Sequence, residues 1–208
     1  YYWRVYAVTE GALSPSSVNG TQATNPGTIF ISVMTGNWAT GATWNTGTVP
    51  SSADDVIIAN GHTVTINQNA ACNNLQVGQG VSGILRIGNN NTVRTVDING
   101  NLSINSGASF VANTASNATH LVTCAGNISN AGTIDMSTDA NSFANVTFDY
   151  AFADQILSGG GTMTRFNLVT VDKGSSMTYM VDVTNTNFTA PAGFLTIRNG
   201  TFRLSSTG

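Results

Sequence analysis

The residues that could carry catalysis are a set of aspartates and one lysine, Lys173, and they are widely scattered. The aspartates in question are Asp97, Asp135, Asp149, Asp154, Asp172 and Asp182. Cleavage of a polysaccharide needs two carboxylates at one bond, carboxylates that hold calcium, or a basic residue set against an acidic sugar. The nearest approach is Asp135 with Asp139, which would share a face with Asp149 and Asp154 in a repetitive fold. Solvated aspartates in polar turns explain the pattern better, so we predict no catalytic residue.

Histidine and cysteine are too few to build a metal centre. His62, in Asn60-Gly61-His62, is expected in a turn, and His120 is expected to open a strand half-buried. Cys72 and Cys124 form no CxxC pair, and the two histidines are the only further ligands of this kind. We therefore predict no metal, no other cofactor and two small buried thiols. A Cys72–Cys124 disulfide in an oxidising compartment is the alternative.

The composition is that of an extracellular β-protein. Only 8% of the residues are charged and the net charge is −3, while Asn, Thr, Ser and Gly are abundant. A disordered tail would carry more charge and fewer apolar residues, and a nucleic-acid partner would require a basic patch that this sequence lacks. No apolar run approaches the roughly 20 residues of a membrane helix. We expect a neutral surface, no nucleic-acid partner and no membrane span in this segment.

Short alternating strands separated by Gly and Asn dominate the sequence from Ile29 onward. Examples are Thr63–Ile66, Ile84–Ile87 and Thr133–Met136, in which every second residue is apolar. No long segment places apolar residues at i, i+3, i+4 and i+7, and the abundant residues are poor helix formers. The chain is therefore predicted to be all-β.

A weak internal repeat distinguishes between all-β architectures. The stretch from Gly100 to Phe110 matches that from Gly126 to Ile134 at an offset of 26, a third copy begins at Gln155, and a looser fourth begins at Asn187. Repetition at one length predicts a right-handed parallel β-helix, a solenoid whose rungs stack about 4.8 Å apart. Rungs of about 22 to 30 residues would place about five or six between Val56 and Leu204. Asn stacked at the corners would form amide ladders. A β-sandwich is the alternative.

The same offset bears on the two cysteines. Cys72 and Cys124 would lie two rungs apart, roughly 10 Å, which is too far for a disulfide. The spacing favours free thiols.

The N-terminal stretch differs from the rest of the chain. Residues 1–18 alternate large and polar side chains and then break at Gly11 and Pro15. The Tyr-Tyr-Trp-Arg-Val strand resembles the C-terminal strands of a fibronectin type III module. Residues 19–28 are expected to be a linker, and 29–208 a β-helix with an N-terminal cap around 36–58 that continues beyond 208.

The cap segment carries the most specific motifs. It reads Gly36-Asn37-Trp38, Thr43-Trp44 and Val49-Pro50, then Ala53-Asp54-Asp55-Val56-Ile57-Ile58, and a Cys-Asn-Asn-Leu strand follows at Cys72. This order resembles the start of β-helical regions in large surface proteins of Bacteroidota, and is similar to the G8 type of extracellular module. The resemblance implies a multidomain adhesin or matrix protein, joined to fibronectin-type modules and exported by the type IX system.

Trp38 and Trp44 have two possible roles. Large aromatic side chains are suited to cover the open first rung of a solenoid, whose apolar core would otherwise be exposed. The same rings could form a platform for glycan contact, and they are the only binding residues that the sequence suggests.

Threonine pairs suggest one more kind of surface. Thr63/Thr65, Thr162/Thr164 and Thr184/Thr186 resemble flat ice-binding arrays, but they do not recur at one rung period. We therefore assign them to β-propensity on an exposed face.

These observations predict a structural and adhesive module of a secreted bacterial surface protein, not an enzyme. Its partners would be other domains of the same long chain and surface glycans or matrix, and its location extracellular or on the cell surface. A carbohydrate-binding module and a polysaccharide lyase or hydrolase of β-helical type are the alternatives.

Overall fold

The computed structural model describes residues 2–5, 8–9, 12–13, 18–21 and 27–205. In the first four ranges, strand β1 (Tyr2–Val5) pairs antiparallel with β4 (Val18–Thr21), and β2 (Val8–Thr9) pairs antiparallel with β3 (Ala12–Leu13). Strand β4 therefore runs three residues into the predicted linker 19–28, and residues 22–26 of that linker lie outside the described residues.

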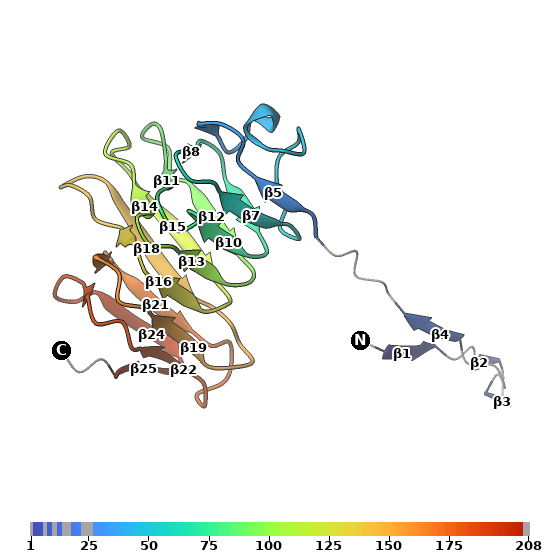
Figure 1. Cartoon of the computed structure of the whole chain (residues 1–208). Helices are drawn as coiled ribbons and strands as arrows, with labels where there is room; N and C mark the ends of the chain where they lie inside the picture. The colour runs from blue at the N-terminus through green and yellow to red at the C-terminus, as the bar shows by residue number, and fades with distance from the viewer. Residues whose placement is uncertain (1, 6–7, 10–11, 14–17, 22–26, 206–208) are drawn as a thin grey trace.

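Residues 29–204 form a parallel β-helix, as the repeat predicted (Figure 1). It has about seven turns, against the five or six rungs predicted between Val56 and Leu204. Sheet 1 contains eight strands: β5 (Ile29–Ile31), β7 (Asp55–Ile58), β10 (Leu75–Val77), β13 (Leu102–Ile104), β16 (Ile128–Asn130), β19 (Gln155–Ser158), β22 (Met180–Val183) and β25 (Thr201–Leu204). Sheet 2 contains seven: β6 (Gly36–Asn37), β8 (Thr63–Ile66), β11 (Ile84–Ile87), β14 (Ser109–Ala112), β17 (Thr133–Asp135), β20 (Met163–Arg165) and β23 (Phe188–Thr189). Sheet 3 contains six: β9 (Ala70–Cys72), β12 (Thr95–Ile98), β15 (Thr119–Cys124), β18 (Phe143–Phe148), β21 (Val169–Asp172) and β24 (Leu195–Asn199).

From β7 onward the chain visits the three sheets in turn, so each strand pairs with the strands of the neighbouring rungs. Leu102 lies beside Ile128, which is the predicted offset of 26, and Ile128 lies beside Leu157 at an offset of 29. Rung length is more variable than predicted, because Val56 lies beside Leu75 at an offset of only 19.

One predicted repeat was wrong. The fourth copy, at Asn187 to Thr189, was expected to continue the row of Gly100, Gly126 and Gln155. Phe188 instead pairs with Thr164 in sheet 2, and β22 continues that row in sheet 1. Gly and Asn occur at several turns of each rung, so these residues alone do not show which of the three sheets the next strand joins.

The apolar core consists of columns of inward-facing residues that stack from rung to rung. In sheet 3, Cys72, Ile98 and Cys124 stand in one column. Ile98 therefore separates the two cysteines, and both are free and buried, as the spacing predicted. Burial raises the pKa of the Cys124 thiol to about 12 and raises that of Cys72 as well, so both remain protonated at neutral pH.

A ladder of side-chain amides follows one corner. Asp55 Oδ1 accepts the backbone N–H of Asn74, and the same contact recurs from Asn74 to Asn101, from Asn101 to Asn127 and from Asn127 to Ile156, the last three at 2.8 Å. Each rung thus satisfies a backbone donor of the next rung at a position where the sheet ladder ends.

Trp38 and Trp44 lie inside the first rung. Their ring centroids are 5.1 Å apart in an edge-to-face arrangement, and the Trp44 indole N–H donates to the Trp38 carbonyl at 2.8 Å. Phe30 packs against Trp44 with ring centroids 6.3 Å apart. The 3₁₀ turn η1 (Gly41–Thr43) connects the two tryptophans. The pair covers the end of the apolar core.

The cap gives the first prediction. Replacing Trp44 by Ala removes a large buried ring and leaves a cavity at the end of the core, so the free energy of unfolding should fall by about 3–5 kcal/mol. Phe152→Ala is the matched control, because the Phe152 side chain is 75% exposed. Chemical denaturation of the three proteins measures the difference. If Trp44→Ala and the unmodified chain were equally stable, Trp38 and Trp44 would not act as a cap of the core.

Candidate functional site

The carboxylates singled out in the sequence do not gather at one place: the charges of Asp97 and Asp172 reach Asp149, but Asp135 and Asp182 lie on other sheets. Asp135 lies on sheet 2, where its two oxygens pair with Arg165 Nε at 2.8 Å and Nη2 at 2.6 Å. Asp139 lies in the following loop and accepts the N–H groups of Asn141 and Ser142. Asp149 follows β18 in sheet 3, whereas Asp135 ends β17 in sheet 2, so the two lie on different sides of the solenoid. The common face considered for these residues does not exist.

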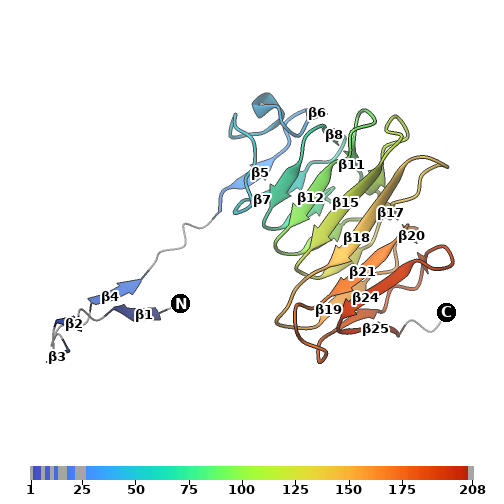
Figure 2. The ribbon, with the colours of Figure 1, turned by 180° about the vertical axis from the view of Figure 1, so that it is seen from behind.

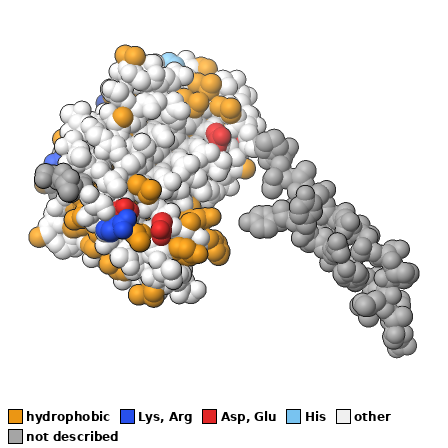
Figure 3. Space-filling view, turned by 60° about the horizontal axis from the view of Figure 1, so that its bottom comes forward, with side chains coloured by type: hydrophobic (Ala, Val, Ile, Leu, Met, Phe, Trp, Pro, Cys, Tyr) orange, Lys and Arg blue, Asp and Glu red, His pale blue; other side chains and the backbone are white. Residues whose placement is uncertain are grey.

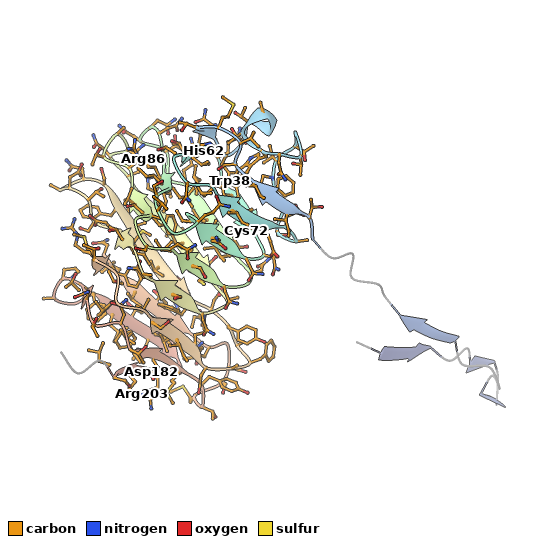
Figure 4. The ribbon with its side chains drawn as sticks, viewed as in Figure 1. Trp38, His62, Cys72, Arg86, Asp182 and Arg203 are labelled. Atoms are coloured by element: carbon orange, nitrogen blue, oxygen red, sulfur yellow. The ribbon has the colours of Figure 1, made fainter. Side chains whose placement is uncertain are left out.

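Three of the aspartates are held by arginines of the next rung. Besides Asp135 with Arg165, Asp182 pairs with Arg203 at 2.6 Å and Asp172 with Arg198 at 3.2 Å. Asp182 and Arg203 lie together at the end of the solenoid opposite to Trp38 (Figure 4). These ion pairs connect rungs and neutralise charge, and Figure 3 accordingly shows a surface with few charged side chains.

His120 is fully buried, whereas the sequence suggested a half-buried residue. Its Nδ1 accepts the backbone N–H of Arg94 at 3.0 Å, so the proton of the neutral ring lies on Nε2, which donates to Ser116 Oγ at 2.9 Å. The Ser116 hydroxyl donates in turn to the Asn90 carbonyl. A serine nucleophile needs the opposite direction, with the histidine accepting its proton. This serine–histidine pair is a structural link.

His62 forms a similar link near the first rung. Its Nδ1 lies 3.0 Å from both the carbonyl and the hydroxyl of Ser32, so the Nδ1–H group donates to the carbonyl. The Ser32 hydroxyl also accepts the N–H of Ala59 at 2.8 Å. His62 holds β5 against the turn after β7, and no nucleophile is activated there.

Trp38 and Trp44 expose only 1% and 2% of their surface. A sugar ring stacks on an exposed aromatic face, and neither indole has one in this structure. The two residues therefore act in the cap, and their geometry gives no support to glycan contact.

The outward side of sheet 3 carries a column of threonines that the sequence did not reveal. Thr123, Thr147, Thr170 and Thr196 are register partners on four successive strands. Asp97 begins the column and accepts the Thr123 hydroxyl at 2.6 Å. Figure 2 shows β12, β15, β18, β21 and β24 side by side. Hydroxyls in this column recur every rung, about 4.8 Å apart.

A partly apolar column stands beside the threonines. It contains Leu121, its register partner Asn145 and Leu168, and the two leucines are 45% and 42% exposed. We define the threonine face as the four threonines together with Leu121, Asn145 and Leu168. It combines regularly spaced hydroxyls with exposed aliphatic groups.

The threonine pairs noted in the sequence behave differently. Thr63 and Thr65 point outward from sheet 2, but Thr164 is buried and receives a hydrogen bond from Asn130 Nδ2 at 2.7 Å. The pairs therefore do not form one exposed array.

Sheet 1 bears a shallow groove on its outward side. The lining residues are Ile29, Asp55, Val56, Ile57, Asn74, Leu75, Gln76, Asn101 and Ser103. Amides and a hydroxyl dominate its polar lining, and Asp55 already accepts hydrogen bonds from Asn73 and Asn74. The groove can therefore offer hydrogen bonds to a neutral ligand.

Other kinds of site find no support in the part of the chain that the structure describes. No three His, Cys, Asp or Glu side chains gather there in an arrangement that could hold a metal ion. Within the same ranges, no helix is long and apolar enough to cross a membrane.

Comparison with known proteins identifies no relative. No family model matches the chain, and no curated protein and no solved structure shows significant similarity to it. The resemblance to Bacteroidota surface proteins remains a prediction from the motifs.

The link at His120 gives the second prediction. Burial and the charge of Arg94 lower the pKa of His120 in the folded protein below that of a free histidine. As the pH falls, the unfolded chain therefore binds a proton at this histidine before the folded protein does. The contribution of neutral His120 to the free energy of unfolding is present above the pKa of the unfolded chain, about 6.5, and is lost as the pH falls below that value. Denaturation curves at pH 7.5 and 5.5 should show this loss. His120→Gln, which keeps a hydrogen-bond donor but does not titrate, should lose less stability over the same interval. Identical losses in both proteins would contradict the assignment.

Proposed function

We propose that this chain is a structural and adhesive module of a secreted bacterial surface protein, and that it contacts neutral polysaccharide through the threonine face. The single observation that carries the proposal is the register of Thr123, Thr147, Thr170 and Thr196 on successive strands. A column of hydroxyls at a fixed spacing suits a ligand that is itself an extended chain with repeated hydroxyls.

The chemistry of the surface supports a neutral ligand. Charged residues make up 8% of the chain, and three of its arginines are paired with aspartates of a neighbouring rung. Exposed Leu121 and Leu168 beside the hydroxyls can cover the C–H faces of sugar rings. An acidic or basic ligand would find few charged partners on this surface.

The structural part of the role rests on the way the rungs are joined. Backbone ladders, the amide ladder at Asp55 to Asn127 and ion pairs such as Asp182–Arg203 all connect one rung to the next. Such a solenoid is a stiff spacer that holds a binding surface away from its attachment point. The motif resemblance supports secretion, a fibronectin-type neighbour and type IX export.

A carbohydrate-binding module that uses the groove of sheet 1 is the second candidate. The groove presents Gln76, Asn101 and Ser103 on one side of the aliphatic residues Ile29 and Ile57, which suits one short glycan. A lyase or hydrolase has no comparable support, because Asp135, Asp172 and Asp182 are each held by an arginine of the next rung.

Three single-lysine variants, compared with the unmodified chain, test the proposal. Thr147→Lys places a long charged side chain in the middle of the threonine face, Gln76→Lys does the same in the groove, and Ser109→Lys adds the same charge to sheet 2. Binding of each protein and of the unmodified chain is measured by co-sedimentation with a panel of insoluble neutral polysaccharides. Circular dichroism confirms that each variant is folded.

The threonine face predicts at least a tenfold loss of binding for Thr147→Lys, with Ser109→Lys unchanged. Loss confined to Gln76→Lys would move the site to the groove. If the unmodified chain sediments with none of the polysaccharides, the adhesive role is wrong.

A further inference from the structure

Lys173, the only lysine of the chain, is buried against a glutamine side chain. It follows β21 and has no exposed surface, and its Nζ lies 2.5 Å from Gln155 Oε1 and 3.3 Å from the carbonyl oxygen of Ala153. Gly200 of the next rung covers the aliphatic stem so closely that a Cβ there would lie 2.5 Å from Lys173 Cγ. The amine is therefore fixed beside one carboxamide and shielded from bulk water.

The carboxamide of Gln155 is held on every side. Its Oε1 also accepts the backbone N–H of Tyr150 at 3.2 Å, and its Nε2 donates to the carbonyls of Cys124 at 2.8 Å and Gly126 at 2.6 Å. Gln155 itself is 1% exposed. The lysine amine and a backbone donor at the carbonyl oxygen, with two acceptors at the amide nitrogen, thus surround a single carboxamide.

We propose that Lys173 and Gln155 form an intramolecular isopeptide bond. The neutral Nζ attacks Cδ of Gln155, a new C–N bond forms, the Cδ–Nε2 bond breaks, and ammonia leaves. The proton that Nζ loses on attack passes to the departing nitrogen. Counted from the lysine ammonium, the products are one secondary amide and one ammonium ion, so no oxidant, reductant or other reactant is consumed.

Each contact of the carboxamide has a role in this step. The Tyr150 N–H donates to the oxygen that becomes negative in the tetrahedral intermediate. The carbonyls of Cys124 and Gly126 accept hydrogen bonds from the nitrogen as it gains its extra proton and leaves. Holding the amine in hydrogen-bond contact with the carboxamide oxygen, beside the carbon that it attacks, replaces a slow encounter between two groups by a reaction within one rung.

The amine is also available in its reactive form. Burial lowers the pKa of Lys173 to about 8, against the opposing charges of Asp154 and Asp149, which favour the ammonium. A substantial fraction of the side chain is therefore neutral in mildly alkaline solution, whereas an exposed lysine, with a pKa near 10.4, is almost wholly protonated. Asp149 and Asp154 are exposed and can carry the first proton to solvent.

The bond would close one rung into a covalent ring. Gln155 begins β19 and Lys173 follows β21, so the linked residues lie at the start and the end of the same turn of the solenoid. A closed rung cannot unwind stepwise, because its two ends stay joined when neighbouring rungs open. This suits a module that carries load.

Intact-mass spectrometry of the denatured chain, before and after incubation at pH 9, tests the proposal. The isopeptide lowers the mass by that of one ammonia, about 17 Da. Trypsin cuts after Arg94, Arg165 and Arg198, so the linked chain yields residues 95–165 joined to residues 166–198, with no cleavage at Lys173.

Controls separate this product from others of the same mass. Succinimide formation at an Asn-Gly pair, such as Asn60-Gly61, also releases ammonia but joins no peptides. Lys173→Arg and Gln155→Asn should both lack the joined peptide, and Lys173→Arg keeps the positive charge. Full sequence mass and separate peptides from the unmodified chain after incubation at pH 9 would overturn the proposal.

Discussion

Backbone hydrogen bonds between successive rungs fix which side chains stand above one another, because each strand pairs with the strands one turn earlier and one turn later. Register partners on successive rungs therefore have similar surroundings. Where such a column points outward and repeats one residue type, it forms a regular strip of surface. The inward columns form the apolar core, the corner column forms the amide ladder from Asp55 to Asn127, and an outward column forms the threonine face. The core, the contacts that join the rungs and the proposed binding surface all follow from this one register.

Corners are the places where that regularity is interrupted, and they contain the buried polar side chains. His120 satisfies the N–H of Arg94 where the chain turns toward β12, and Gln155 satisfies two carbonyls where the chain turns into β19. A buried donor or acceptor without a partner is costly, so polar side chains at corners replace the bonds that a strand would have made. The same requirement places the Lys173 amine beside the Gln155 carboxamide, and the proposed isopeptide bond would use this contact.

The sequence predicts the periodic features and misses those that depend on rung length. Alternation at Thr63–Ile66, the offset of 26 at Gly100 and Gly126 and the separation of Cys72 from Cys124 are all visible because they recur or are simple multiples. The threonine column is hidden because Thr123, Thr147, Thr170 and Thr196 are unequally spaced in sequence. The burial of His120 and the contact between Gln155 and Lys173 are hidden as well, since turns of irregular length bring those partners together.

Oxidation of paired cysteines tests the rung register most directly. Ser103 and Ser129 are register partners facing outward on sheet 1, and Ser158 is the partner of Ser129 one rung further. Neighbouring positions about 4.8 Å apart can form a disulfide, whereas positions two rungs apart cannot. The account predicts rapid closure of the Ser103→Cys/Ser129→Cys pair and none of the Ser103→Cys/Ser158→Cys pair, with the buried native thiols unreactive. A disulfide in the second pair, or none in the first, would contradict the register on which the core, the amide ladder and the threonine face depend.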